Sequence, residues 1–108
     1  MNDGLPIRAY ELRFDGEAFS LSAVKKAAYR FSGQCSFDIH VDNDVIVCSL
    51  LFAEPQTPEY IAKLELGLRN EVLDQDLREA IATETALIRN AVLAMAFSKT
   101  GLQSTDAV

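Results

Sequence analysis

Two alternating runs around a two-residue turn constrain the fold of this chain most. Residues 34–42 and 45–52 alternate apolar and polar side chains, with Asn43-Asp44 between them. A two-residue hairpin places Asp42 opposite Val45 and fixes every later pair. That register collects the apolar side chains of both strands on one face: Cys35, Phe37, Ile39, Val41, Ile46, Cys48, Leu50 and Phe52. A slip by one residue would bury acidic side chains instead, so the register is strongly specified.

The same register separates the two cysteines. Cys48 lies opposite Ile39, so Cys35 is four residues further along the neighbouring strand, about 13 Å away and beyond disulfide reach. We interpret both as small core residues. With no Cys-x-x-Cys and a single His, no zinc or iron–sulfur ligand set can be drawn, and no metal or cofactor is predicted.

The opposite face of the first hairpin strand carries Asp38, His40 and Asp42. Alternate residues share a face but lie about 7 Å apart, and no second His completes a metal shell. We therefore interpret this run as a solvated edge strand, whose charges block stray pairing. The following strand is apolar on both faces and is expected to be central, with a candidate contact surface at Val45, Val47 and Leu51.

Two further elements precede the hairpin. Residues 7–14 alternate and predict a strand that ends at Asp15-Gly16. Ser20 is a predicted N-cap for a helix reaching about Ser32. The outer face of this helix is the most basic patch of the chain, which we interpret as a solvated face rather than a site: Lys25, Lys26 and Arg30.

After the hairpin, Thr57-Pro58 predicts the start of a helix. Its apolar spacing is Ile61, Leu64 and Leu68, although alternation at Leu64, Leu66 and Leu68 leaves a strand as the alternative. A break is expected at residues 74–76, with Asp74 or Asp76 capping a final helix.

The final helix is predicted from residues 70–98, which contain no Gly or Pro. Apolar residues recur there with the spacing of one buried helix face: Leu73, Leu77, Ile81, Ile88, Val92 and Met95. Glu84 interrupts this stripe. It either meets solvent or an Arg at the stripe's edge, or is a buried carboxylate placed for a partner.

A polar row runs beside the stripe: Asn70, Asp74, Arg78, Thr85 and Arg89. Asp74 and Arg78 stand four apart with the acid first, which favours an ion pair worth about 0.3–0.5 kcal/mol. The row is a solvated face, a set of caps at the expected break, or a contact site.

The element order β-α-β-β-α-α predicts an α+β fold. A right-handed crossover makes the first two strands parallel, and the third fits antiparallel between them. The result is a two-layer split β-α-β arrangement with a three-stranded mixed sheet in order 2-3-1 and helices mainly on one face. We expect a single domain over residues 1–108, with flexible segments at 1–6 and 99–108.

Composition excludes several classes of function. The 108 residues carry a net charge of −6, which argues against a nucleic-acid partner. No uninterrupted apolar run approaches about 18–20 residues, so no membrane segment is expected. No signal peptide is visible at the N-terminus, so the expected location is the cytoplasm.

Four C-terminal segments carry a family resemblance: residues 70–79 (NEVLDQDLRE), 84–85 (ET), 88–90 (IRN) and 96–98 (AFS). They resemble the His-Xaa-Ser system protein HxsD, a family whose hallmark is an Asn/Asp-rich step into Leu-x-Arg-Glu. The resemblance implies a gene neighbourhood with two radical-SAM-type proteins and a small His-Xaa-Ser repeat protein, and hence a role in modifying that repeat protein.

The leading hypothesis is a non-catalytic accessory protein that binds the maturation enzyme, the repeat substrate, or both. The predicted partner-binding residues are Asn70, Asp74, Arg78, Glu79 and Arg89. One alternative is an enzyme with Asp74 or Glu84 as general base and Arg78 orienting an anion. Another is a structural domain that forms a homodimer through the apolar sheet surface described above.

Overall fold

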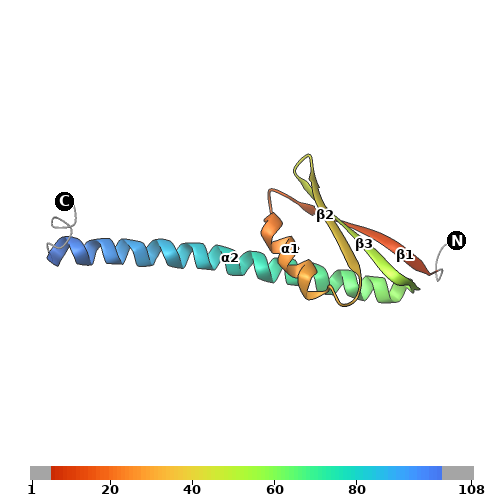
Figure 1. Cartoon of the computed structure of the whole chain (residues 1–108). Coiled ribbons are helices and arrows are strands. Elements are labelled where there is room, and N and C mark those ends of the chain that lie inside the picture. Colours follow the sequence, from red (N-terminus) through yellow and green to blue (C-terminus); the bar gives the residue numbers. More distant parts are fainter. Residues whose placement is uncertain (1–5, 101–108) are drawn as a thin grey trace. The chain divides into compact units, whose positions relative to one another are not determined.

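A computed structural model describes residues 6–100 of the chain, with side-chain exposure for residues 6–98 (Figure 1). The elements in order are β1 (Ile7–Asp15), α1 (Leu21–Arg30), β2 (Ser36–Asp42), β3 (Val45–Gln56) and α2 (Pro58–Thr100). Contacts divide the chain into two compact units, one up to Leu77 and one from Arg78 onward. Expectations for residues 1–5 and 101–108 lie outside the described residues.

The sheet of the first unit has the order β1-β3-β2, and β3 is antiparallel to both neighbours. This confirms the predicted α+β fold and the order 2-3-1. The two outer strands run in the same direction, but both hydrogen-bonded ladders are antiparallel. α1 and the first-unit part of α2 cover the same face of the sheet (Figure 1).

The hairpin follows the predicted register at all seven pairs of the ladder, from Asp42 opposite Val45 to Ser36 opposite Leu51. Asp42 lies opposite Val45, and Cys48 lies opposite Ile39. Asn43 and Asp44 have φ values of 50° and 63°, which is the left-handed pair that a tight two-residue hairpin turn requires. Both cysteines are buried free thiols, as predicted.

The core lies between the sheet and the two helices of the first unit. Its sheet side comes from the predicted apolar face of all three strands, and its helix side comes from one stripe on each helix. The buried members are Leu12, Phe14, Val24, Ala27, Cys35, Ile46, Cys48, Leu50, Phe52, Ile61, Leu64, Leu68 and Val72.

Side-chain caps begin both helices. Ser20 has extended backbone angles, and its Oγ accepts a hydrogen bond of 2.9 Å from the Ala23 N–H. α1 ends at Arg30, two residues before the expected Ser32. Thr57 Oγ1 accepts a hydrogen bond of 3.2 Å from the Tyr60 N–H at the start of α2. The two predicted N-caps are therefore confirmed.

The start of α2 resolves the choice between helix and strand. Leu64 and Leu68 are buried, whereas Leu66 between them is 64% exposed. A strand would have placed all three side chains on one face. Helical spacing therefore governs this segment.

The predicted break at residues 74–76 is wrong, because α2 continues as one helix to Thr100. Residues 70–98 contain no Gly or Pro to interrupt it. Asp76 caps a different helix: its Oδ1 accepts a hydrogen bond of 3.0 Å from the backbone N–H of Ser20 at the start of α1. The element order is therefore β-α-β-β-α.

The predicted buried stripe is also wrong from Leu73 onward. The buried side of α2 consists of Ile61, Leu64, Leu68 and Val72. The six residues of the predicted stripe are all between 49% and 66% exposed. Within the second unit, the described residues form only helix, so no second element of that unit is present among them to cover an apolar face.

The argument against a membrane-spanning segment also needs correction. By length and composition alone, α2 over Pro58–Ser98 is long and apolar enough to cross a membrane. The sequence argument considered only apolar runs without any interruption. Residues 80–97 contain just two charged side chains, Glu84 and Arg89, so the segment as a whole is apolar despite these interruptions.

Candidate functional site

The five predicted partner-binding residues are distributed over both units. Asn70 and Asp74 lie in the first unit, one turn apart on α2, and both are exposed. Arg78, Glu79 and Arg89 lie in the second unit.

In the second unit, Arg78 and Arg89 are exposed and Glu79 is half-buried. The two arginines are eleven residues apart, which is close to three full turns, so they project from the same side of the helix. Thr83 Oγ1 donates a hydrogen bond of 3.0 Å to the Glu79 carbonyl oxygen. Cationic groups thus mark one side of the second-unit part of α2, at its first residue and again near its middle.

Beside those arginines runs an exposed apolar surface, which we call the α2 stripe: Ile81, Ile88, Val92 and Met95. These side chains project within about 60° of one another around the helix axis and are 59–66% exposed. Leu87, Leu93 and Phe97 add further exposed apolar area on other sides of the helix. Apolar area of this extent typically marks an interaction site.

Glu84 is exposed, so the hypothesis of a buried carboxylate is wrong in this structure. At 100° per residue it borders the α2 stripe on one side, while Arg89 borders it on the other. The stripe therefore has an acidic and a basic margin. Such margins give a docking helix a defined orientation on its partner.

The carboxylates of the enzyme hypothesis, Asp74 and Glu84, are both exposed and fall in different units. Among the described residues, no three His, Cys, Asp or Glu side chains are grouped so that they could hold a metal ion. The predicted edge-strand residues Asp38 and His40 lie opposite Ser49 and Val47 on β3.

The predicted apolar contact surface on the sheet is smaller than expected. Val47 is only 3% exposed, Val45 is half-buried, and Leu51 is 56% exposed. A residue as buried as Val47 cannot contribute to a contact surface. Leu51 is the large exposed apolar side chain of this set.

One residue of the predicted basic patch has a structural role. Arg30 Nε lies 3.2 Å from Glu71 Oε2, linking α1 to α2. Gln75 Nε2 donates a hydrogen bond of 2.8 Å to the same oxygen. Lys25 and Lys26 remain on the exposed side of α1.

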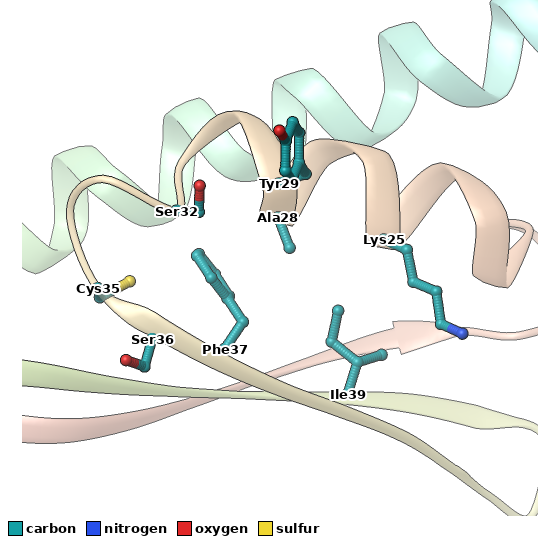
Figure 2. Close-up of a pocket in the computed structure, with 8 residues that line it drawn as sticks. All are labelled: Lys25, Ala28, Tyr29, Ser32, Cys35, Ser36, Phe37 and Ile39. Carbon is teal, nitrogen blue, oxygen red and sulfur yellow. The ribbon is translucent and has the colours of Figure 1, made fainter.

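Sequence reasoning missed a groove between α1 and β2 (Figure 2). Its volume is about 470 Å³, and its walls are Lys25, Ala28 and Tyr29 from α1, Ser32 and Cys35 from the connection, and Ser36, Phe37 and Ile39 from β2. Tyr29 is 79% exposed. The sequence contained one signal for this groove: Tyr29, an aromatic residue, stands among the cationic residues of the outer face of the helix.

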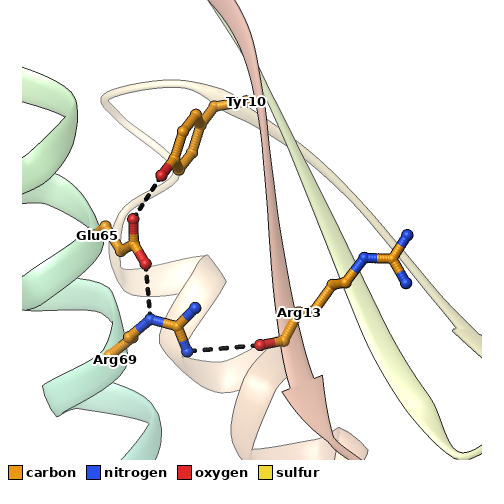
Figure 3. A network of polar contacts seen from close by, with 4 residues as sticks. All are labelled: Tyr10, Arg13, Glu65 and Arg69. Carbon is orange, nitrogen blue, oxygen red and sulfur yellow. Dashed lines mark hydrogen bonds and ion pairs between the residues drawn. The ribbon is translucent and has the colours of Figure 1, made fainter. Parts of the chain in front are cut away.

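A polar network connects α2 to β1 (Figure 3). The Tyr10 hydroxyl and Arg69 Nε donate to the two oxygens of Glu65 at 2.7 and 2.8 Å. Arg69 also donates to the Arg13 carbonyl oxygen at 3.4 Å and lies 5.0 Å from the centre of the Phe14 ring. The hydrogen bonds from Tyr10 and Arg69 lower the pKa of Glu65, and the bond to Glu65 raises the pKa of Tyr10. All residues of this network belong to the first unit, where it joins α2 to the sheet.

The sequence profile of the family described as His-Xaa-Ser system protein HxsD matches residues 14–103. The chain belongs to the HxsD family. The match includes α1, β2, β3 and α2. No curated protein and no solved structure matches this HxsD protein. The family name associates it with the His-Xaa-Ser system.

Proposed function

We propose that this HxsD protein is a non-catalytic accessory protein that binds a radical-SAM-type maturation enzyme, the His-Xaa-Ser repeat protein, or both. The proposed contact is the second unit, through the α2 stripe. The observation that supports it is the exposure of 59–66% at every residue of that stripe.

The spacing of the α2 stripe fits a helix that lies in a groove of another protein. Ile81, Ile88, Val92 and Met95 follow the steps of seven, four and three residues that place anchors along one helix face. In water these side chains leave apolar area exposed, and burying it against a partner is favourable by about 25 cal/mol per Å². A partner bound there would bury the α2 stripe, which no other element covers among the described residues of the second unit.

The charged margins favour a protein partner over a lipid bilayer. α2 has the length and apolar content of a membrane-crossing helix. However, Glu84 and Arg89 fall near the middle of its apolar stretch, where each charged residue costs about 2.5–3.5 kcal/mol in a bilayer. A protein groove can pair both charges, and complementary charges improve the specificity of docking.

In this proposal, the polar residues predicted from the sequence assist the docking. Arg78 and Arg89 share the basic margin, and Glu79 lies on the same unit. Asn70 and Asp74, on the first unit, are proposed as a separate polar contact. Acidic groups suit a His-containing repeat best when its imidazoles are protonated.

The test is a binding measurement between the full chain and each purified partner, the maturation enzyme and the repeat protein. The double substitution Ile88→Ser and Val92→Ser should weaken binding by at least about tenfold, equivalent to about 1.4 kcal/mol. Leu51→Ser is the matched control, because Leu51 has similar exposure but lies on the sheet. A wild-type chain that binds neither partner would overturn the proposal, as would equal losses in the control.

A second set of variants examines the charges. Arg89→Glu should slow association with the partner, whereas Lys63→Glu, an equal charge change at an exposed position of the first unit, should not. Asn70→Ala and Asp74→Ala measure the separate contact on the first unit. Binding to lipid vesicles, abolished by the same Ile88 and Val92 substitutions and accompanied by no binding to either protein, would replace the protein partner with a membrane.

A further inference from the structure

The outer edge of β2 presents backbone groups for another strand. In a two-residue hairpin the residues beside the turn, Asp42 and Val45, exchange both backbone hydrogen bonds, and bonded pairs alternate along the ladder. The N–H and C=O groups of Phe37, Ile39 and Val41 therefore point away from β3. Within residues 6–100, no strand pairs with that edge.

The two faces of β2 have different side chains. Phe37, Ile39 and Val41 project toward the helix layer, and the first two are half-buried. Asp38 and His40 project from the other face, and both are exposed. A strand added at this edge would meet apolar side chains on one face and charged ones on the other.

We propose that two copies of this chain associate through antiparallel pairing of their β2 strands, with Ile39 of one copy opposite Ile39 of the other. The three-stranded sheets then join into one continuous sheet. Ile39 is the middle residue of Ser36–Asp42, so this register pairs all seven residues of each strand. It also satisfies the outward backbone groups of Phe37, Ile39 and Val41 from both copies.

The side chains are complementary in this register. Asp38 lies opposite His40 of the second copy, and twofold symmetry repeats that pair. Phe37 lies opposite Val41 of the second copy on the helix face. A carboxylate facing an imidazole forms a complementary polar pair, and apolar cross-strand pairs also stabilise a sheet, whereas like charges directly opposite destabilise it.

Other registers are poorer. Centring the pair on His40 would place Asp38 opposite Asp42 of the second copy, and centring it on Asp38 would place two copies of Asp38 together. Centring it on Val41 keeps a His40–Asp42 pair but leaves only residues 40–42 within the strands. The sequence of β2 is thus most complementary to itself about its own centre.

The groove between α1 and β2 supports the same arrangement. It lies beside the open edge, and its lining includes half-buried Phe37 and Ile39 together with Tyr29, which is 79% exposed (Figure 2). A strand added to β2 would lie along the open side of this groove and cover Phe37 and Ile39. The pairing therefore removes apolar area from water as well as completing the hydrogen bonds.

The polar complementarity of β2 to itself points to a second copy as the occupant. An unrelated extended segment could use the same backbone groups, but nothing would require it to place an imidazole opposite Asp38 and a carboxylate opposite His40. This inference uses α1 and β2 and is independent of the docking proposed for the second unit. Either proposal can fail without the other.

A positional cross-linking experiment tests the register in the full chain. Ile39→Cys should form a covalent dimer under mild oxidation, because hydrogen-bonded antiparallel partners have Cα atoms about 5.5 Å apart, within disulfide range. Val41→Cys is the matched control on the same face. Its two copies would stand four residues out of register, about 13 Å apart, and should remain monomeric on a non-reducing gel. The native Cys35 and Cys48 are buried, and the wild-type chain controls for them.

A charge-exchange series tests the pairing without cross-linking. In sedimentation velocity, Asp38→Lys should weaken the dimer about five- to tenfold, because it places a lysine opposite His40 in two symmetric pairs. Adding His40→Asp to that variant should restore the dimer. Asp42→Lys carries the same charge change but lies opposite Ser36, so it should have little effect.

Three results would overturn the proposal. The first is a wild-type chain that stays monomeric at the highest attainable concentration. A monomeric chain that binds an added foreign peptide at β2 counts as the same negative result. The second is Ile39→Cys failing to cross-link, or Val41→Cys cross-linking equally well. The third is the double charge exchange remaining as weak as Asp38→Lys. Circular dichroism of each variant confirms that it is folded before its association is measured.

Discussion

The Tyr10 hydroxyl and the Glu65 carboxylate, 55 residues apart in sequence, are joined by a hydrogen bond of 2.7 Å (Figure 3). Tyr10 belongs to an outer strand of the sheet and Glu65 to the first part of α2. Arg69 donates to the other oxygen of Glu65, so the carboxylate accepts from a strand and from its own helix. These bonds favour the ionised carboxylate, which is why the pKa of Glu65 is lowered from 4.5.

This network makes stability depend on pH in the acid range. Because the pKa of Glu65 is lower in the folded state, its contribution is present above about 4.5 and is lost as pH falls through the folded value. Glu65→Gln should lower the free energy of unfolding by about 1 kcal/mol at neutral pH and progressively less below pH 4.5. Urea unfolding of both proteins across this range gives the comparison. Glu54→Gln, at an exposed position, is the control, and a pH-independent difference for Glu65→Gln would contradict the assignment.

The two leucines on either side of Gly67 predict opposite effects of one substitution. Leu68 is 1% exposed within the core, and Leu66 is 64% exposed on the same helix. Leu68→Ala should destabilise the chain by about 2–5 kcal/mol, and Leu66→Ala by less than about 0.5 kcal/mol. Thermal or urea unfolding of both variants measures the difference. Similar losses at both positions would mean that α2 packs with a different face toward the sheet.

The parts of the fold that the sequence predicted correctly depend on local patterns. Asn43-Asp44 fixed the hairpin register, and Ser20 and Thr57 fixed two helix starts through hydrogen bonds within three residues. The strand order followed from one crossover rule and one hairpin. Each of these constraints acts between neighbours or along a single ladder.

The errors come from contacts that local patterns do not contain. Asp76 has the sequence of an N-cap for a new helix, but its carboxylate accepts from Ser20, 56 residues away. Ile88 and Val92 have the same four-residue spacing as Leu64 and Leu68, because a buried helix face and an exposed apolar helix face obey the same period. Sequence spacing therefore identified the apolar face shared by residues 73–95, but it could not show that burial on α2 ends at Val72. The partner-binding role of Asn70, Asp74, Arg78, Glu79 and Arg89 remains a prediction.

Gly16 is required by a close backbone contact. Its N–H donates a hydrogen bond of 2.7 Å to the Asp44 carbonyl oxygen, and a Cβ added at Gly16 would lie 2.5 Å from that oxygen. Gly16→Ala should therefore displace the hairpin turn and destabilise the chain by about 1–3 kcal/mol. Gly33→Ala is the control, because a Cβ there meets no atom within 4 Å. Equal melting temperatures for the two variants would show that the turn adjusts without cost.

The ionisation and reactivity of the Cys48 thiol report on the packing of the first-unit core. Burial raises the pKa of its thiol from 9.0 to about 11, and burial also raises the pKa of Cys35. A group whose pKa is raised by folding adds stability below its unfolded value and loses it as pH rises through the folded value, so Cys48 should weaken the fold above about pH 9.

At neutral pH the thiolate fraction of Cys48 in the folded state should be about a hundredfold below that of a free thiol, since two pKa units separate them. Disulfide-exchange labelling of Cys35→Ala, which leaves Cys48 as the reporter, should therefore be slow in buffer and fast in urea. Cys48→Ala leaves Cys35, which is 9% exposed beside the groove of Figure 2 and should react sooner. Rapid labelling of Cys48 in the folded chain would show that the sheet and helices of the first unit separate far more often than this packing allows.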